Sequence, residues 1–190
     1  MSATSAPFGL RPAYSPSGVI RPVQGTIASG YATTIFDGQP VRIAPATSGG
    51  ETEGTIVAAA VGARFIGTFC GVEWTDSDGR RRVSNRWASG TTGTDIVCYY
   101  TRDPSIVYEI QSNAALNVAD IGKQYDFTAA SGNTTTGLST QMLDVASAAA
   151  NASFRLLGIT PGPDNAWGDN FVIAQVQISE HQNVADVAAY

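Results

Sequence analysis

The chain has little of several residue types on which protein chemistry commonly depends. Its 190 residues include one histidine, two cysteines and a single lysine, Lys123. One histidine excludes a metal site built from several imidazoles, and it leaves one candidate base for a nucleophile–base pair. Cys70 and Cys98 are too far apart in sequence for a C-x-x-C zinc site. No phosphate-binding P-loop, G-x-G-x-x-G or G-x-S-x-G motif occurs. The sequence therefore offers no complete catalytic signature and predicts neither a cofactor nor a metal site.

Charge is scarce as well. Charged residues make up 14% of the chain, and the formal net charge is −5; soluble domains average roughly 25% charged residues. A negative chain lacks the basic stripe that offsets phosphate, so we expect no direct contact with nucleic acid. The basic run at residues 80–82 is too short to change that. An uncharged polar surface can be buried without stranding ions, which favours a structural protein over an enzyme; a secreted β-domain is the alternative.

Long apolar runs are also missing. No stretch approaches the ~20 apolar residues of a membrane span, and residues 1–10 lack the basic and apolar parts of a signal peptide. We therefore expect no membrane association and synthesis in the cytosol. There the two cysteines are expected to be reduced and to act as small buried hydrophobic side chains.

Short strands separated by Gly, Pro and Asp fill most of the chain. Residues 106–110 and 172–178 alternate apolar and polar side chains with period two, and residues 37–38 and 76–79 are hairpin turn signals. Other strands are expected at residues 31–36, 39–44, 55–61, 63–74, 80–87, 95–101, 123–129, 141–145 and 153–160. Helical propensity is confined to residues 113–122 and 146–152. The pattern predicts an all-β fold, an antiparallel β-sandwich or barrel, jelly-roll-like.

The first 25 residues differ from the rest. Prolines recur every four to six residues, and each fixes φ and lacks an N–H donor. We predict an extended N-terminal arm at residues 1–25 and a single β-domain at residues 26–190, with a body that still folds after deletion of residues 1–22. Because the arm keeps apolar side chains, it should lie on its own body or on a neighbour. The expected interface residues are Phe8, Leu10, Arg11 and Tyr14.

Few residues are candidates for chemistry. His181 follows the last strand, where we expect an exposed side chain; a hydrolase using it as a base is a minor hypothesis. Asp76-Ser77-Asp78-Gly79 resembles the start of a calcium loop, but Trp87 stands where the final acidic ligand is needed, so a hairpin turn explains it better. The strand aromatics are expected first in the core, with a glycan-binding platform as the alternative.

Several segments together resemble a known family. They are APFGLRP at residues 6–12, DIG at 120–122, YDF at 125–127, GNTTTGLS at 132–139, LD at 143–144, FRLLG at 154–158, PDN at 163–165 and EHQ at 180–182. In this order they are similar to the capsid cement, or decoration, proteins of tailed bacteriophages. The resemblance covers the two ends and the C-terminal half, and it does not extend to residues 49–90. Gly162 stands where the family pattern has an arginine.

The resemblance implies a non-enzymatic β protein of the virion. It would bind the outer capsid surface and bridge neighbouring major capsid subunits as a homo-oligomer, with a trimer expected before a dimer. The alternative is a phage tail- or fibre-associated adhesion module that binds glycans.

Overall fold

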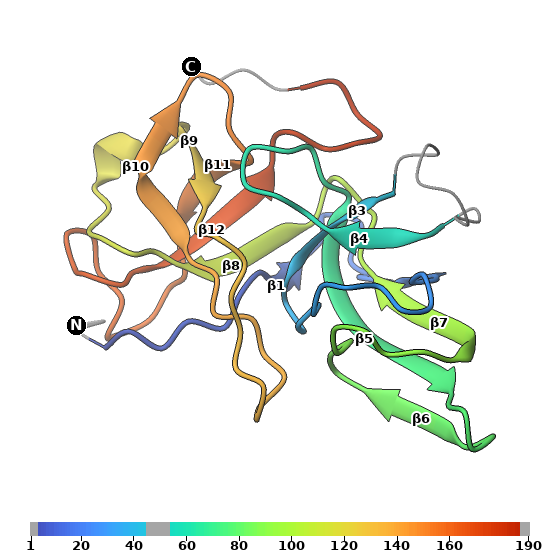
Figure 1. The fold of residues 1–190 in the computed structure, drawn as a ribbon. Coiled ribbons are helices and arrows are strands. Elements are labelled where there is room, and N and C mark those ends of the chain that lie inside the picture. The colour runs from blue at the N-terminus through green and yellow to red at the C-terminus, as the bar shows by residue number, and fades with distance from the viewer. Residues whose placement is uncertain (1–3, 45–53, 187–190) are drawn as a thin grey trace.

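A computed structural model describes residues 4–44 and 54–186, and these form two antiparallel sheets (Figure 1). They contain twelve strands and one short 3-10 turn, η1 (Val118–Asp120). The prediction of an all-β fold, an antiparallel β-sandwich or barrel, is therefore confirmed. The composition of residues 47–54 predicts a polar, Gly-rich loop, and all of it except Gly54 lies outside the described residues.

The first sheet has six strands in the order β1-β8-β12-β11-β9-β10. In chain order they are β1 (Arg11–Tyr14), β8 (Val107–Gln111), β9 (Gln124–Phe127), β10 (Leu143–Ala149), β11 (Phe154–Ile159) and β12 (Ile173–Ile178). The sheet is curled: Ser112, just after β8, forms a parallel bridge to Leu143 at the start of β10. The Asn113 N–H donates to the Leu143 carbonyl at 3.0 Å, so the β8 and β10 sides of the sheet meet.

The second sheet follows the order β2-β7-β5-β3-β4, with β6 paired to β5. Its strands are β2 (Val23–Gly25), β3 (Pro40–Ile43), β4 (Ile56–Ala58), β5 (Gly67–Thr75), β6 (Arg81–Ser84) and β7 (Thr94–Tyr100). Its two ends also meet, through a parallel bridge between Thr26 and Thr55. Since β2 to β7 all lie in this sheet, the strands change sheet only twice along the chain.

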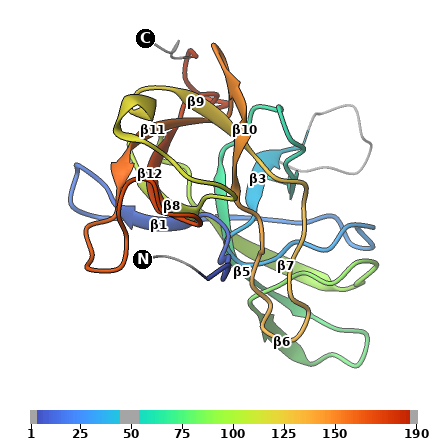
Figure 2. The same cartoon turned by 90° about the vertical axis from the view of Figure 1, so that its left-hand side faces the viewer.

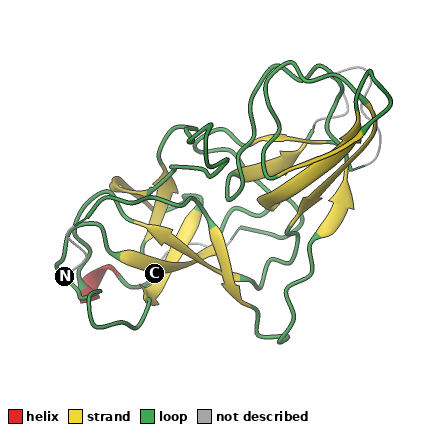
Figure 3. Cartoon of the chain, turned by 90° about the horizontal axis from the view of Figure 1, so that it is seen from below, coloured by secondary structure: helices red, strands yellow, loops and turns green. Residues whose placement is uncertain are grey.

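Each curled sheet encloses its own hydrophobic core. We call residues 4–14 and 103–186 lobe 1, and residues 15–44 and 54–102 lobe 2; the two strand groups are separate when seen from below (Figure 3). The lobe 1 core holds 15 buried hydrophobic residues. Its centre is an aromatic cluster in which Phe65 packs edge-on against Phe127 and Phe154, with ring centroids 5.8 and 5.4 Å apart. The lobe 2 core holds ten, including Trp87, which packs edge-on against Trp74.

The lobes join along a seam in which neighbouring residues serve different cores. Phe65 lies in the lobe 1 core although lobe 2 supplies it, and the next residue, Ile66, lies in the lobe 2 core. Thr101 ties the same region together, because its hydroxyl accepts the Thr68 N–H at 2.9 Å and lies 2.8 Å from the Tyr108 hydroxyl. The described part of residues 26–190 is thus one continuous body with two cores.

Several local expectations need correction. Residues 31–36 do not form a strand; only Ile35 makes an isolated bridge, to Trp87. Residues 146–152, where the alanines favour helix, continue β10 up to Ala149, because pairing with β9 outweighs local propensity. At residues 113–122 only the short turn η1 is helical.

The two cysteines are free in this fold. Cys98 is buried in the lobe 2 core, and Cys70 is half-buried at the seam. Their expected role as small core side chains is confirmed for Cys98.

Candidate functional site

The predicted interface residues lie in residues 8–14, which cross the seam between the lobes. Leu10 is fully buried in the lobe 1 core, and its N–H donates to the Gly38 carbonyl of lobe 2 at 2.7 Å. Gly9 and Gly38 both have positive φ and cross closely; a Cβ on Gly9 would lie 2.5 Å from the Gly38 oxygen. Only glycine tolerates that crossing without strain. Leu10 therefore holds the chain to its own body and offers no surface to a partner.

The described arm residues are integrated into both sheets. β1 pairs with β8, so Arg11 stands opposite Glu109, and β2 pairs with β7. Gln111 fixes the start of the segment, since its side-chain oxygen accepts the Ala6 N–H and its amide donates to the Thr4 carbonyl. We expected the arm to lie either on its own body or on a neighbour, and in the structure its described residues lie on their own body. With Leu10 in the core, deletion of residues 1–22 would open that core, contrary to our expectation of an intact body.

Arg11 and Phe8 form an outward-facing pair. The Arg11 guanidinium lies 4.6 Å from the centre of the Phe8 ring and is bonded to Glu109 through Nη2 and Nε at 2.5 and 3.2 Å. Thr160 donates to the other Glu109 oxygen at 2.9 Å. Exposed ion pairs contribute little stability, so this arrangement mainly orients Arg11. The pair presents a guanidinium stacked on an aromatic ring, with its charge balanced by Glu109.

Tyr14 continues this surface along the edge of the first sheet. Its side chain is 49% exposed, and Val19, beyond the turn closed by the Gly18 N–H and the Ser15 carbonyl, is 54% exposed. The turn is held by Ser15, whose hydroxyl contacts the carboxylate of Asp103. Large exposed side chains on a fixed turn can be buried by a partner with little loss of conformational entropy. We call Phe8, Arg11, Tyr14 and Val19 the N-terminal face.

A hollow of about 210 Å³ lies behind this face. It is lined by Phe8, Leu10 and Pro12 from the arm and by Asp37, Phe69, Cys70 and Leu138 from both lobes. Burial raises the pKa of Asp37, and burial together with the Asp37 charge raises the pKa of the Cys70 thiol to about 12. The thiol is therefore protonated at neutral pH and is a poor nucleophile. The hollow suits an apolar side chain better than covalent chemistry.

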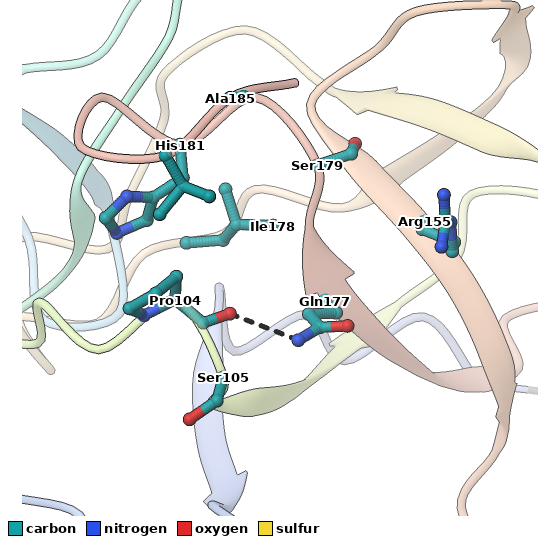
Figure 4. Close-up of a pocket in the computed structure, with 9 residues that line it drawn as sticks. Pro104, Ser105, Arg155, Gln177, Ile178, Ser179, His181 and Ala185 are labelled. Carbon is teal, nitrogen blue, oxygen red and sulfur yellow. Dashed lines mark hydrogen bonds between the residues drawn. The ribbon is translucent and has the colours of Figure 1, made fainter. Parts of the chain in front are cut away.

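A second hollow, of about 220 Å³, is lined by lobe 1 residues alone and lies near the end of the described chain (Figure 4). His181 and Arg155 lie on opposite sides of it, and Gln177 donates to the Pro104 carbonyl at 3.1 Å. His181 was expected to be exposed, but it is only 2% exposed, because its backbone bridges to Phe65. Its Nδ1 accepts the Asn183 N–H at 3.1 Å, and burial lowers its pKa.

This geometry gives His181 a structural role. Within the described ranges, 4–44 and 54–186, the His181 ring is hydrogen-bonded to a backbone N–H, and the nearby Ser179 hydroxyl donates to the Ala152 carbonyl instead. The hydrolase hypothesis thus gains no nucleophile–base pair from the described residues. No group of three or more potential metal ligands occurs among them either. Asp76 is a turn residue, since its Oδ1 accepts the N–H groups of Asp78 and Arg80, each at 3.0 Å; the hairpin interpretation is confirmed.

Residues 180–186 tie the two lobes together. The Gln182 side chain accepts the Ile43 N–H at 2.7 Å and donates to the Ile43 carbonyl at 3.3 Å, so it pairs with the edge of β3 as a backbone would. Glu180 and Gln182 bracket Phe65 through backbone bonds, and Arg64 pairs with Asp186. Sequence reasoning missed Gln182 and Gly38, because both act through contacts with residues distant in the chain.

The described residues contain no helix long and apolar enough to cross a membrane. Comparisons with models of protein families, with curated protein sequences and with solved structures found no match.

Proposed function

We propose that this protein is a non-enzymatic capsid cement protein of a tailed bacteriophage. It would bind the outer surface of the head, bridge neighbouring major capsid subunits and so stabilise the shell. It would be made in the host cytoplasm and reside in the virion as a homo-oligomer, a trimer before a dimer. The resemblance of eight short segments to that family is the starting point.

The positions of those segments support the proposal. Residues 6–12 and 180–182 hold the lobes together along the seam, and residues 125–127 and 154–158 belong to the central strands β9 and β11 of lobe 1. Each is a structural position and not a reactive one. Segments that maintain the fold and carry no reactive group are what we expect in a protein that acts by binding to other subunits.

The N-terminal face is the observation that carries the proposal. It combines two aromatic side chains, Phe8 and Tyr14, with the guanidinium of Arg11. Tyrosine and arginine are enriched among the interface residues that contribute most of the binding free energy. The face is rigid, since Leu10 anchors it in the core and the Gly9–Gly38 crossing fixes its direction. A pre-ordered surface loses little entropy on binding.

The physics of a shell favours such a contact. A standard interface buries roughly 1,600 Å², and a head presents the same subunit junction many times over. A modest binding free energy at each junction then adds up over the whole particle. Binding on both sides of a junction opposes its separation.

The test is binding to heads of the parent phage made without this protein. The double variant Tyr14→Ala/Val19→Ser should fold normally and lose about tenfold or more in affinity for the heads, because it removes the exposed apolar part of the face. Val61→Ala, at a site 48% exposed and outside the face, is the matched control. Co-sedimentation and the heat resistance of the decorated heads are the measurements.

Two results would contradict the proposal. Wild-type protein that does not bind the heads refutes the function. Unchanged binding by the double variant refutes the face.

The glycan-binding alternative gains less from the structure. Of the aromatic residues considered for a platform, Phe65, Phe69 and Tyr108 are fully buried in the two cores, and Trp74, Tyr99 and Phe171 are only partly exposed. Binding of the isolated protein to a glycan array, without affinity for heads, would favour that alternative.

A further inference from the structure

The hollow behind the N-terminal face contains a carboxylate that has no cation paired with it. Of the described residues that line this hollow of about 210 Å³, only Arg11 and Asp37 carry a charge. Arg11 is bonded to Glu109 through Nη2 at 2.5 Å, so the charges of that pair cancel. Asp37 forms no ion pair within the described part of the chain. The net charge of the hollow is therefore negative and comes from Asp37.

Two segments distant in the sequence hold the backbone at Asp37. Its N–H donates to the Gly137 carbonyl at 3.0 Å, and its carbonyl accepts the Ser139 N–H at 2.8 Å. Both partners belong to the loop between β9 and β10, which extends from lobe 1 onto lobe 2 (Figure 2). The next residue, Gly38, accepts the Leu10 N–H of the arm at 2.7 Å. The backbone that carries this carboxylate is therefore fixed before any ligand binds.

Asp37 has also lost part of its contact with water. Burial raises the pKa of its carboxyl group, and the Gly38 N–H offsets this only in part. Glu73, Asp76 and Asp120 differ, since each forms an ion pair with an arginine or lysine. A half-buried carboxylate attracts a cation more strongly than an exposed one, because water screens the charge less. The cost of removing that water is already present in the free protein.

The walls of the hollow are apolar. They consist of side chains from the arm, from β5 and from the β9–β10 loop: Phe8, Leu10, Pro12, Phe69 and Leu138. Leu138 is 38% exposed, so the hollow is open to solvent beside it. Walls of this kind suit an alkyl chain, because each methylene group that they bury contributes favourable free energy. The hollow thus combines apolar walls with a single negative charge.

This combination fits a lysine side chain. Lysine buries a flexible alkyl stem and presents a compact ammonium group. A carboxylate satisfies only part of the donor set of an arginine, and the remaining N–H groups would face apolar walls. The chain's single lysine, Lys123, is bonded to Asp120 at 2.8 Å. We therefore expect the lysine to come from a different protein and not from a second copy.

We propose that this hollow binds a lysine side chain of a neighbouring major capsid subunit, with the alkyl stem against Phe8 and Leu138 and the ammonium group on the Asp37 carboxylate. The identity of the partner rests on the proposed function. The site itself, which recognises an alkylammonium group, does not depend on it. Because the hollow shares Phe8 and Arg11 with the N-terminal face, both belong to one contact surface.

The site is tested without capsids by titrating the full chain with n-butylammonium chloride and following the backbone amides by NMR. Shifts are expected at Asp37, Gly38 and Cys70. Affinity should rise from methylammonium to n-butylammonium by roughly fourfold for each methylene group that becomes buried. Uncharged 1-butanol should bind about tenfold more weakly than n-butylammonium, because it has no charge to pair with the carboxylate.

Asp37→Ser removes the carboxylate and should weaken n-butylammonium binding about tenfold. Serine is used because an asparagine before Gly38 would deamidate and regenerate a carboxylate. Asp78→Ser is the matched control, since Asp78 also precedes a glycine, is exposed and forms no ion pair with a described residue. It should leave binding unchanged. Thermal melting shows whether each variant is folded; if Asp37→Ser is not, the comparison with 1-butanol on the wild type decides.

Binding to heads made without this protein tests the partner. Asp37→Ser should lose about tenfold in affinity for these heads, and Asp78→Ser should match the wild type. Acetylation removes the charge of the lysines on the heads. Wild type and Asp37→Ser should therefore bind acetylated heads equally.

The inference is overturned if n-butylammonium does not bind, if 1-butanol binds as tightly, or if Asp37→Ser binds the amine as the wild type does. Tighter binding of acetylated heads by the wild type than by Asp37→Ser would also overturn it, since the group recognised would not be a lysine. Wild-type protein that binds the amine through Asp37 but binds no heads would refute the proposed function and support the alkylammonium site.

Discussion

The two lobes are built alike and differ in what they bury and what they expose. Both are curled antiparallel sheets closed by one parallel bridge, Ser112–Leu143 in lobe 1 and Thr26–Thr55 in lobe 2. Lobe 1 has the larger core and receives Leu10 and Phe65 from outside its strands. Lobe 2 has the smaller core and extends an exposed hairpin. The lobe 1 core therefore depends on side chains from outside its own strands.

The largest loss of stability is expected from truncating a side chain at the centre of the lobe 1 core. Phe154→Ala deletes a fully buried ring that packs against Phe65, and it should lower the free energy of unfolding by about 3–5 kcal/mol. Because Phe65 and Ile66 connect the cores, we expect lobe 2 to unfold in the same transition. Denaturant unfolding followed by circular dichroism and by tryptophan fluorescence tests this.

The control is Val83→Ala, which alters an exposed side chain and should stay within about 0.5 kcal/mol of the wild type. Two separate transitions in the Phe154→Ala variant would show that the lobes unfold independently.

Leu10→Ala tests whether the N-terminal segment belongs to lobe 1. Leu10 is fully buried, so its truncation should cost about 2–5 kcal/mol. Leu157→Ala is the same substitution at a partly exposed position and should cost far less. Equal stability of Leu10→Ala and the wild type in denaturant would mean that the segment is a dispensable arm after all.

Gln182→Ala tests the connection between the lobes at the C-terminal side. It removes both bonds to the Ile43 backbone and should cost about 1–3 kcal/mol. Hydrogen exchange should speed up at the Ile43 amide, with little change in the centre of either core. Val184→Ala, two residues on and exposed, serves as the control; if it has the same effect, the glutamine bonds are not the cause.

The smallest effect is the pH dependence that comes from His181. Burial lowers its folded pKa, so the unfolded chain binds a proton more readily. Its contribution to stability is complete above the ordinary histidine pKa of about 6.5 and is lost as pH falls toward the folded pKa. Asp37 and Glu180, whose pKa values are raised by burial, act in the opposite direction at lower pH.

The difference between wild type and His181→Gln isolates the histidine. Unfolding free energies measured from pH 7.5 to pH 5, a span of about two and a half units around the histidine pKa, should fall more steeply for the wild type. Parallel curves would show that His181 does not titrate differently on folding.

Local patterns identified most strands but not the positions where the chain crosses between lobes. The alternation of Ile106, Tyr108 and Ile110, and of Val172, Ala174, Val176 and Ile178, placed all seven side chains in or beside the core, where they are buried. Period two is a local property, and turns such as Asp76–Gly79 are local as well. These features follow from sequence because neighbouring residues determine them.

The errors lie where distant residues decide. Leu10 reads as an arm residue until β1 pairs with a strand 98 residues away. His181 reads as exposed until its backbone meets Phe65. Each of these requires knowing which segments are neighbours in space.

The adjacent pair Phe65 and Ile66 has a consequence for engineering. Two consecutive residues face two different cores, so no cut point in this segment leaves both halves with a complete interior. Either lobe expressed alone would expose a hole where the other's residue belongs. Although the chain has two cores, its lobes cannot be exchanged or expressed as independent domains. An engineered scaffold based on this protein must therefore contain both lobes.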